Sequence, residues 1–130
     1  MLSSIEAHTR TISSICLIPD GVASSSHDFT VRRWKKEEGS SQKAISLKCL
    51  KVIPHKNLVT SVKSQGDAVF SIDWEGTILE TDSNDSKIYP CENDSLRTLI
   101  HYENKIITGS WSGMLQVIDR RTDEVKSIKA

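Results

Sequence analysis

Histidines and cysteines are the side chains of this sequence best suited to catalysis or metal binding, and they are widely scattered. They are His8, His27, His55, His101, Cys16, Cys49 and Cys91. No two cysteines form a C-x-x-C pair, so the spacing predicts neither a structural zinc site nor a disulfide framework. The sequence also lacks a phosphate-binding glycine loop, an H-E-x-x-H motif and a nucleophile elbow. We therefore expect no metal, no cofactor and no enzyme activity.

The charge of the chain is balanced, with 17 basic and 17 acidic side chains. A nucleic-acid platform should be basic, and a polybasic membrane anchor should carry a cluster of lysines and arginines. The basic residues from Arg32 to Lys36 are followed at once by two glutamates, which favours a solvated charged segment. Neither a leader-like segment nor a membrane-spanning apolar stretch is evident. We expect a cytoplasmic or nuclear protein with reduced cysteines and no membrane partner.

Three segments of the sequence align without a gap, which predicts an internal repeat. They begin at residues 24, 71 and 108, so successive segments lie 47 and 37 residues apart. They read S-S-S-H-D-F-T-V-R-R-W, S-I-D-W-E-G-T-I-L-E-T and T-G-S-W-S-G-M-L-Q-V-I. At the same offsets the apolar residues Ile15, Val62 and Leu99 coincide, as do the turn formers Asp20, Asp67 and Asn104.

Each repeat reads as four short β-strands. In the first repeat the strands are predicted at Ile12–Ile18, Gly21–Ser26, Thr30–Trp34 and Ser46–Ile53, with turn residues at their ends. The polar loop Glu37–Lys43 accounts for the greater length of this repeat. Short, evenly spaced strands with a period near 40 predict an all-β fold of three four-stranded antiparallel propeller blades. The approximate blade limits are residues 6–53, 54–91 and 92–130, in a single repeat region.

Four polar and aromatic residues of the first repeat carry a family resemblance. His8 precedes the first strand, Ser24 lies on the second, Asp28 lies in the next turn and Trp34 ends the third. In this pattern the chain resembles the WD-repeat (WD40) family of β-propellers. The resemblance implies a structural hydrogen-bonded tetrad that satisfies the buried indole, hydroxyl and imidazole groups. It implies no acid–base catalysis by His8 and Asp28.

The second and third repeats depart from this pattern. The second has His55, Ser71, Glu75 and Thr81 at the four tetrad positions, and the third has Glu92, Thr108, Ser112 and Ile118. Both still resemble divergent blades. The segment G-S-W-S-G-M-L-Q-V-I-D-R-R is similar to the mitotic-checkpoint and messenger-RNA-export WD-repeat subfamily.

Three blades do not close a ring, since propellers typically contain four to eight. An open arc leaves a bare sheet face and a bare strand edge at each end. Leu2–Ile5 would suit a strand that closes the ring. Three explanations stay open: the chain is part of a longer propeller, two copies form a six-bladed homodimer, or another subunit supplies the missing blades.

The resemblance also implies a partner-binding face at the turns between second and third strands. The residues just before the tight-turn Asp position are His27, Trp74 and Trp111, and those that flank the start of each first strand are Thr11, Ser13, Leu58, Thr60, Ser95 and Arg97. Tryptophan is enriched at binding hot spots, although these tryptophans would equally suit packing between blades. Arg97 beside Trp111 would suit an acidic or phosphorylated peptide.

A non-catalytic scaffold that binds other proteins is therefore the predicted function. The alternative is a subunit of a nucleic-acid-associated or RNA-processing complex. Direct nucleic-acid binding is not expected, because Asp73 and Glu75 flank Trp74 in the sequence and Asp94 lies close to Arg97.

Overall fold

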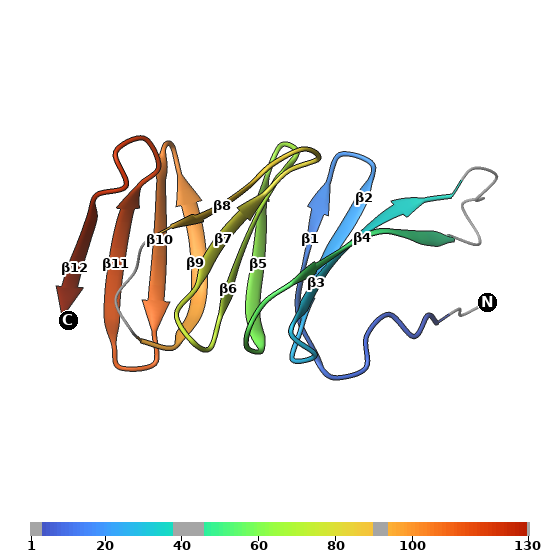
Figure 1. Ribbon diagram of the computed structural model, residues 1–130, viewed down its shortest axis with the longest axis horizontal. Coiled ribbons are helices and arrows are strands. Elements are labelled where there is room, and N and C mark those ends of the chain that lie inside the picture. Colours follow the sequence, from blue (N-terminus) through green and yellow to red (C-terminus); the bar gives the residue numbers. More distant parts are fainter. Residues whose placement is uncertain (1–3, 38–45, 90–93, 130) are drawn as a thin grey trace.

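Every regular element of the described chain is a β-strand. The computed structural model describes residues 4–37, 46–89 and 94–129, and Figure 1 shows their arrangement. The strands are β1 (Ile12–Ile18), β2 (Gly21–Ser26), β3 (Thr30–Lys36), β4 (Leu47–Pro54), β5 (Val59–Gln65), β6 (Ala68–Asp73), β7 (Ile78–Thr81), β8 (Ser86–Tyr89), β9 (Leu96–Tyr102), β10 (Lys105–Ser110), β11 (Met114–Asp119) and β12 (Val125–Lys129).

The strands form three antiparallel sheets, each of four consecutive strands. We call β1–β4 blade 1, β5–β8 blade 2 and β9–β12 blade 3; they stand side by side from right to left in Figure 1. The predicted all-β fold of three four-stranded blades is confirmed. The boundary predicted between residues 91 and 92 lies outside the described residues. So does most of the predicted closing strand at residues 2–5, and Ser4 and Ile5 form no strand.

The turn after the second strand has the same backbone geometry in every blade. Phe29, Gly76 and Gly113 lie at equivalent repeat positions and all adopt positive φ angles, of 73°, 99° and 88°. Glycine adopts this left-handed conformation without steric cost, whereas phenylalanine does so rarely. The shared conformation at Phe29 indicates that the surrounding hairpin determines the turn, which supports the gapless repeat alignment.

The first strand of each blade carries a β-bulge at one position. The pairing register shifts between Ile12 and Ser14, between Val59 and Ser61, and between Leu96 and Thr98. The extra residues are Ser13, Thr60 and Arg97. A bulge re-aims the side chain that it carries, so these three side chains leave the regular alternation of the strand.

Apolar residues fill the two spaces between neighbouring blades. The core between blades 1 and 2 contains Ala23, Val31, Ile53, Val59, Val62, Val69 and Leu79. The core between blades 2 and 3 contains Phe70, Ile72, Ile78, Tyr89, Leu96, Leu99, Ile106 and Ile118. Side chains alternate between the two faces of a strand, so blade 2 contributes one face to each core. The blades are therefore held together mainly by burial of apolar surface.

Polar contacts also join the blades. The hydroxyl groups of the bulge residues Ser13 and Thr60 donate to the carbonyl oxygens of Val59 (2.7 Å) and Leu96 (2.6 Å) in the next blade. The guanidinium of Arg33 binds a carboxylate oxygen of Asp67 at 2.6 Å. These bonds satisfy backbone and side-chain groups at the blade seams, and they fix the relative height of the three sheets.

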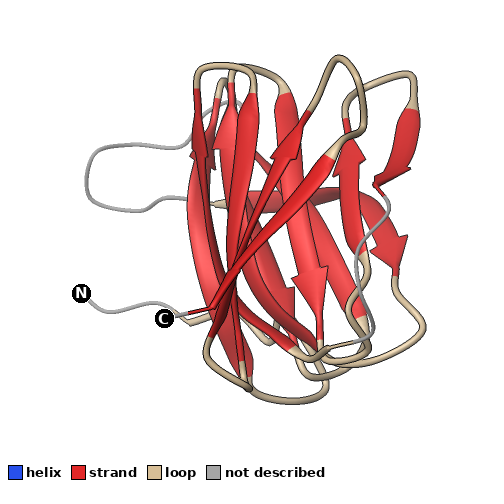
Figure 2. Cartoon of the chain, turned by 90° about the vertical axis from the view of Figure 1, so that its left-hand side faces the viewer, coloured by secondary structure: helices blue, strands red, loops and turns tan. Residues whose placement is uncertain are grey.

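The outward faces of blades 1 and 3 are apolar and exposed. Ile15 and Leu17 on β1 are 66% and 77% exposed, whereas Val62 and Leu99, at the Ile15 position in the other blades, are buried. Leu115 on β11 is 45% exposed, although its equivalents in the other two blades belong to the cores. Figure 2 views the molecule from the blade 3 end. Both ends of the arc thus carry the kind of surface that is buried inside it.

Candidate functional site

A hydrogen-bonded chain joins the four tetrad residues of blade 1. The Trp34 indole Nε1–H donates to the Ser24 hydroxyl at 2.9 Å, and Ser24 lies 2.7 Å from His8 Nε2. His8 Nδ1 lies 2.9 Å from Asp28 Oδ2. A carboxylate can only accept, so Nδ1 carries a proton, and in the neutral imidazole Nε2 then accepts from the Ser24 hydroxyl. The tetrad joins the segment before β1 to β2, β3 and the turn between them.

The electrostatics of Asp28 fit this structural role. Burial disfavours the charged carboxylate, but hydrogen bonds from Thr30, His8 and the Thr9 amide outweigh it and lower its pKa to about 2. Asp28 is therefore ionised at neutral pH, and its carboxylate accepts hydrogen bonds from these neighbours. A side chain with so low a pKa is a poor proton shuttle at neutral pH.

Blade 2 builds a similar network with a different acidic residue. His55 Nε2 lies 2.8 Å from the Ser71 hydroxyl, and His55 Nδ1 lies 2.8 Å from Asp73 Oδ2. The other Asp73 oxygen accepts the amides of Glu75 (3.0 Å) and Thr77 (2.9 Å). The interpretation of Glu75 as the tetrad acid is thus wrong. Counting residues without gaps places Glu75 there, but its side chain is exposed, and Asp73 reaches the histidine from the end of β6.

Blade 3 stabilises the equivalent turn by other means. The hydroxyl of Ser112 donates to the Asp94 carboxylate, and the Ser110 hydroxyl accepts the Met114 amide at 3.1 Å. Hydrogen bonds from Ser110 and Ser112 lower the pKa of Asp94. The buried Thr108 hydroxyl has no hydrogen-bond partner among the described residues, and the predicted tetrad residue Glu92 lies outside them.

The three candidate turn residues are held by one repeated backbone hydrogen bond. The amides of His27, Trp74 and Trp111 donate to the carbonyl oxygens of Thr11, Leu58 and Ser95 at 2.9, 3.0 and 2.8 Å. Each acceptor immediately precedes the first strand of its blade. The structure therefore places the turn residue and the strand entrance together in every blade, at the lower end of the molecule in Figure 1.

Arg97 and two tryptophans form a cluster at this end. The Trp74 and Trp111 rings lie 5.5 Å apart between centroids, at an angle of 58°. Arg97 Cζ lies 5.5 Å from the Trp74 centroid and 5.3 Å from the Trp111 centroid. Both distances are within the range of cation–π attraction. The bulge at Arg97 thus directs a long side chain back across the face, to aromatic residues of two blades.

A groove of about 450 Å³ runs across the same face. We call it the turn-face groove, and it is lined by Thr11, Ile12, Ser13, His27, Leu58, Thr60, Trp74 and Arg97. Seven of the nine residues predicted to bind a partner line it. Trp111 reaches it through Arg97, and Ser95 lines a neighbouring hollow with Trp74, Glu75 and Asp94. Sequence reasoning missed Ile12, whose position at the start of a strand, between two predicted residues, was a usable signal.

Two of the predicted binding residues have their side chains engaged within the protein. Ser13 and Thr60 use their hydroxyl hydrogens in the bonds between blades described above. They shape the wall of the turn-face groove, but they have no hydrogen left to donate to a partner.

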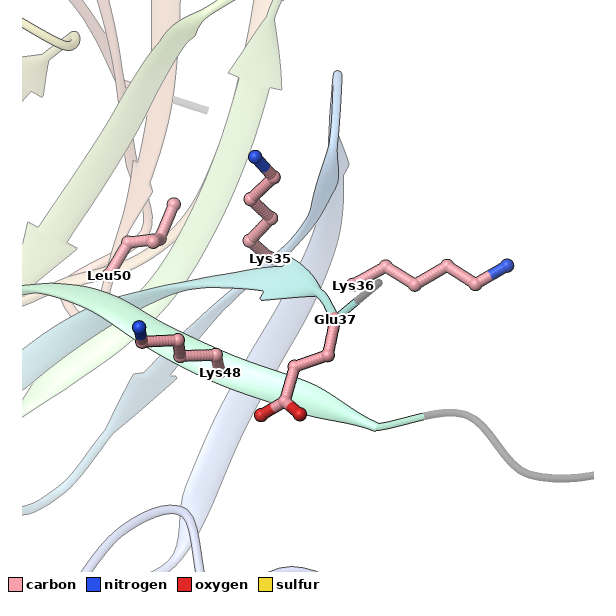
Figure 3. A pocket seen from close by; sticks show the side chains of 5 residues that line it. All are labelled: Lys35, Lys36, Glu37, Lys48 and Leu50. Carbon is pink, nitrogen blue, oxygen red and sulfur yellow. The ribbon is translucent and has the colours of Figure 1, made fainter. Parts of the chain in front are cut away.

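A larger hollow lies on blade 1, between the end of β3 and the beginning of β4, away from the turn-face groove. Lys35, Lys36, Glu37, Lys48 and Leu50 line it. Figure 3 shows that these side chains diverge: Lys36 points away from Lys35, and Glu37 points away from both. Charged groups that do not converge on one point do not make a binding site.

Metal binding and thiol chemistry each require particular groupings of side chains. No group of three or more His, Cys, Asp or Glu side chains within them could hold a metal ion. Burial raises the pKa of the Cys16 thiol, which makes it a poor nucleophile. In the same part of the chain, no helix is long and apolar enough to cross a membrane.

Comparison with known proteins defines the class of fold. The family model named WD domain, G-beta repeat matches residues 1–35, a span that contains the whole blade 1 tetrad. No curated protein sequence matches the chain. Among solved structures, the crystal structure of the computationally designed Ika4 protein is similar with a TM-score of 0.79 and 20% identity, over 95% of this chain and 74% of that one. This likeness shows the fold alone, and no comparison supports the predicted subfamily similarity.

Proposed function

We propose that this chain is a non-catalytic protein-interaction scaffold that binds a segment of another protein in the turn-face groove. The observation that carries the proposal is the construction of the groove. Residues from all three blades line it at equivalent repeat positions, and an exposed tryptophan, Trp111, stands beside it with 68% of its surface accessible. Rigid strands hold the lining in place, and a preformed site loses little entropy on binding.

The WD-repeat match in blade 1 supports this proposal, because WD repeats generally serve as protein-interaction scaffolds. The blade 1 tetrad and the His55–Ser71–Asp73 network of blade 2 hold turns and strands together, so the proposal places partner binding in the groove and not at these polar residues. A cytoplasmic or nuclear location stays a prediction from the sequence.

Selection of peptides from a randomised display library on the purified chain would test the proposal. Thr11→Tyr fills part of the groove with a larger side chain, and the Thr11 hydroxyl that it replaces makes no hydrogen bond among the described residues. Trp111→Ala removes the exposed aromatic. Selected peptides should bind each variant at least about tenfold more weakly. Arg121→Ala, at the opposite end of the blades, is the control and should bind normally. Failure to enrich any peptide, or binders that ignore both groove variants, would contradict the proposal.

We further propose that another body covers the exposed ends of the arc, either a second copy of the chain or a complementing set of blades. The support is positional: Ile15 and Leu115 are exposed where their equivalents in the other blades are buried. Light scattering on a size-exclusion column distinguishes the outcomes. A mass of twice 14.5 kDa would support a six-bladed homodimer, and a monomer that binds a hydrophobic dye would show uncovered faces.

A further inference from the structure

We propose that the segment bound in the turn-face groove presents an anionic side chain, a carboxylate or a phosphate, to Arg97. This inference rests on the proposed function and specifies the chemistry of the partner. It is carried by the guanidinium of Arg97, its two tryptophan neighbours and the distribution of charge on either side of Trp74.

Arg97 is held ready for such a group. Two indole rings lie within about 5.5 Å of its guanidinium carbon, so the side chain is positioned without losing its hydrogen-bond donors to protein acceptors. No carboxylate among the described residues lies within ion-pair distance of it, whereas Arg33 and Arg120 are both paired. A guanidinium presents donors in a planar fork that matches two oxygens of a carboxylate or phosphate. Holding that fork in place lowers the entropy lost on binding.

The charge of the groove lining favours the same ligand. Among the described residues that line the groove, Arg97 is the only lysine, arginine, aspartate or glutamate. Of the described acidic residues on this face, Asp28 lines a hollow beside His27 together with Arg10, and Glu75 and Asp94 line the separate hollow on the other side of Trp74. An anion is therefore attracted to the Arg97 side and repelled from the other side, which sets the direction of the bound segment.

A purely internal role for Arg97 makes a different prediction. Ser13 and Thr60, its equivalents, donate to the backbone of the next blade. If Arg97 served only to meet a further blade in this way, anionic peptides would not affect its tryptophan neighbours. The experiment below separates the two roles.

The probes are four capped pentapeptides of sequence Gly-Ala-X-Ala-Gly, with phosphoserine, glutamate, glutamine or lysine at X. Binding to the full chain is followed by the NMR signals of the indole N–H groups and of the Arg97 Nε–H. The phosphoserine and glutamate peptides should shift the Trp74, Trp111 and Arg97 signals and bind at least about tenfold more tightly than the glutamine peptide. Raising the salt concentration from about 50 to about 200 mM should weaken the binding of these two anionic peptides. Trp34, bonded to Ser24 and buried, is the internal control and should not shift.

Variants complete the test. Arg97→Ala should abolish the preference for anionic peptides while its backbone spectrum shows an intact fold, and Arg97→Lys should retain part of it. Arg121→Ala removes the same charge at the far end and should change nothing. The ratio of phosphoserine to glutamate affinity identifies the source of the anion. Preference for the lysine peptide would overturn the proposal and place a cation in the acidic hollow.

Failure of this inference can be told apart from failure of the proposed function. If all four peptides bind equally and Thr11→Tyr abolishes that binding, the groove binds peptides and the anion inference is wrong. If no peptide shifts any groove signal at millimolar concentration, the inference is overturned. Peptide selection, which does not depend on charge, then decides the proposed function by itself.

Discussion

Replacing Asp73 with asparagine should destabilise the protein strongly, whereas the same loss of charge at Glu75 should not. The Asp73 side chain is fully buried and accepts three hydrogen bonds, from His55 and from the Glu75 and Thr77 amides. Asparagine retains only one acceptor oxygen, so at least one buried donor loses its partner at a cost of about 1–3 kcal/mol. Hydrogen bonds to a charged acceptor are also stronger than those to a neutral one. We expect Asp73→Asn to lower the free energy of unfolding by about 2–3 kcal/mol.

Urea denaturation followed by circular dichroism measures this loss. With a urea dependence typical of small domains, the midpoint should fall by roughly 1–2 M. Glu75→Gln is the matched control, because it also removes one negative charge, from an exposed side chain two residues after Asp73. It should change the free energy of unfolding by less than about 0.5 kcal/mol. Equal losses in the two variants, or a larger loss at Glu75, would refute the assignment of Asp73 as the tetrad acid of blade 2.

Three further predictions concern stability. Asp28 has a pKa of about 2 in the folded chain against an ordinary 3.8, so it contributes about 2 kcal/mol above pH 4 that is lost as the pH falls toward 2; urea midpoints against pH should show this, and Asp28→Asn should remove it. Gly21→Ala would drive a methyl group into the Trp34 carbonyl and should cost about 2 kcal/mol, and a neutral result would contradict that close approach. Ile78→Ala should cost about 3 kcal/mol and Leu115→Ala, at the equivalent exposed position, less than about 1; similar costs would show that the blade 3 face is covered in solution.

Much of the fold could be predicted because its signals are local. Alternating apolar residues and turn formers define each strand and hairpin within a few residues, as in β1 and β2 on either side of Asp20. Residues related by the offsets of 47 and 37 also share the same turn conformation, as the positive φ angles of Phe29, Gly76 and Gly113 show. These features need no knowledge of which blade lies beside which.

The candidate site could be predicted only in outline. Repeat-equivalent positions correctly grouped His27 with Trp74 and Trp111, since the same backbone bond fixes all three. They could not show that Asp73 rather than Glu75 reaches His55, because that depends on the path of the chain through the turn. A gapless alignment matches residues by their number along the repeat, but it does not show which side chain reaches a given partner.

The sequence by itself determined the strands, the three blades and the candidate binding face, because these follow from patterns repeated along the chain. Only the tertiary structure decided that Ser13 and Thr60 join neighbouring blades while Arg97, at the equivalent bulge, turns back over Trp74 and Trp111. The physical reason is that the role of a bulged side chain depends on what stands opposite it. For Ser13 and Thr60, a backbone carbonyl of the next blade lies within hydrogen-bond distance. For Arg97, at the end of the arc, two indole rings lie within reach instead.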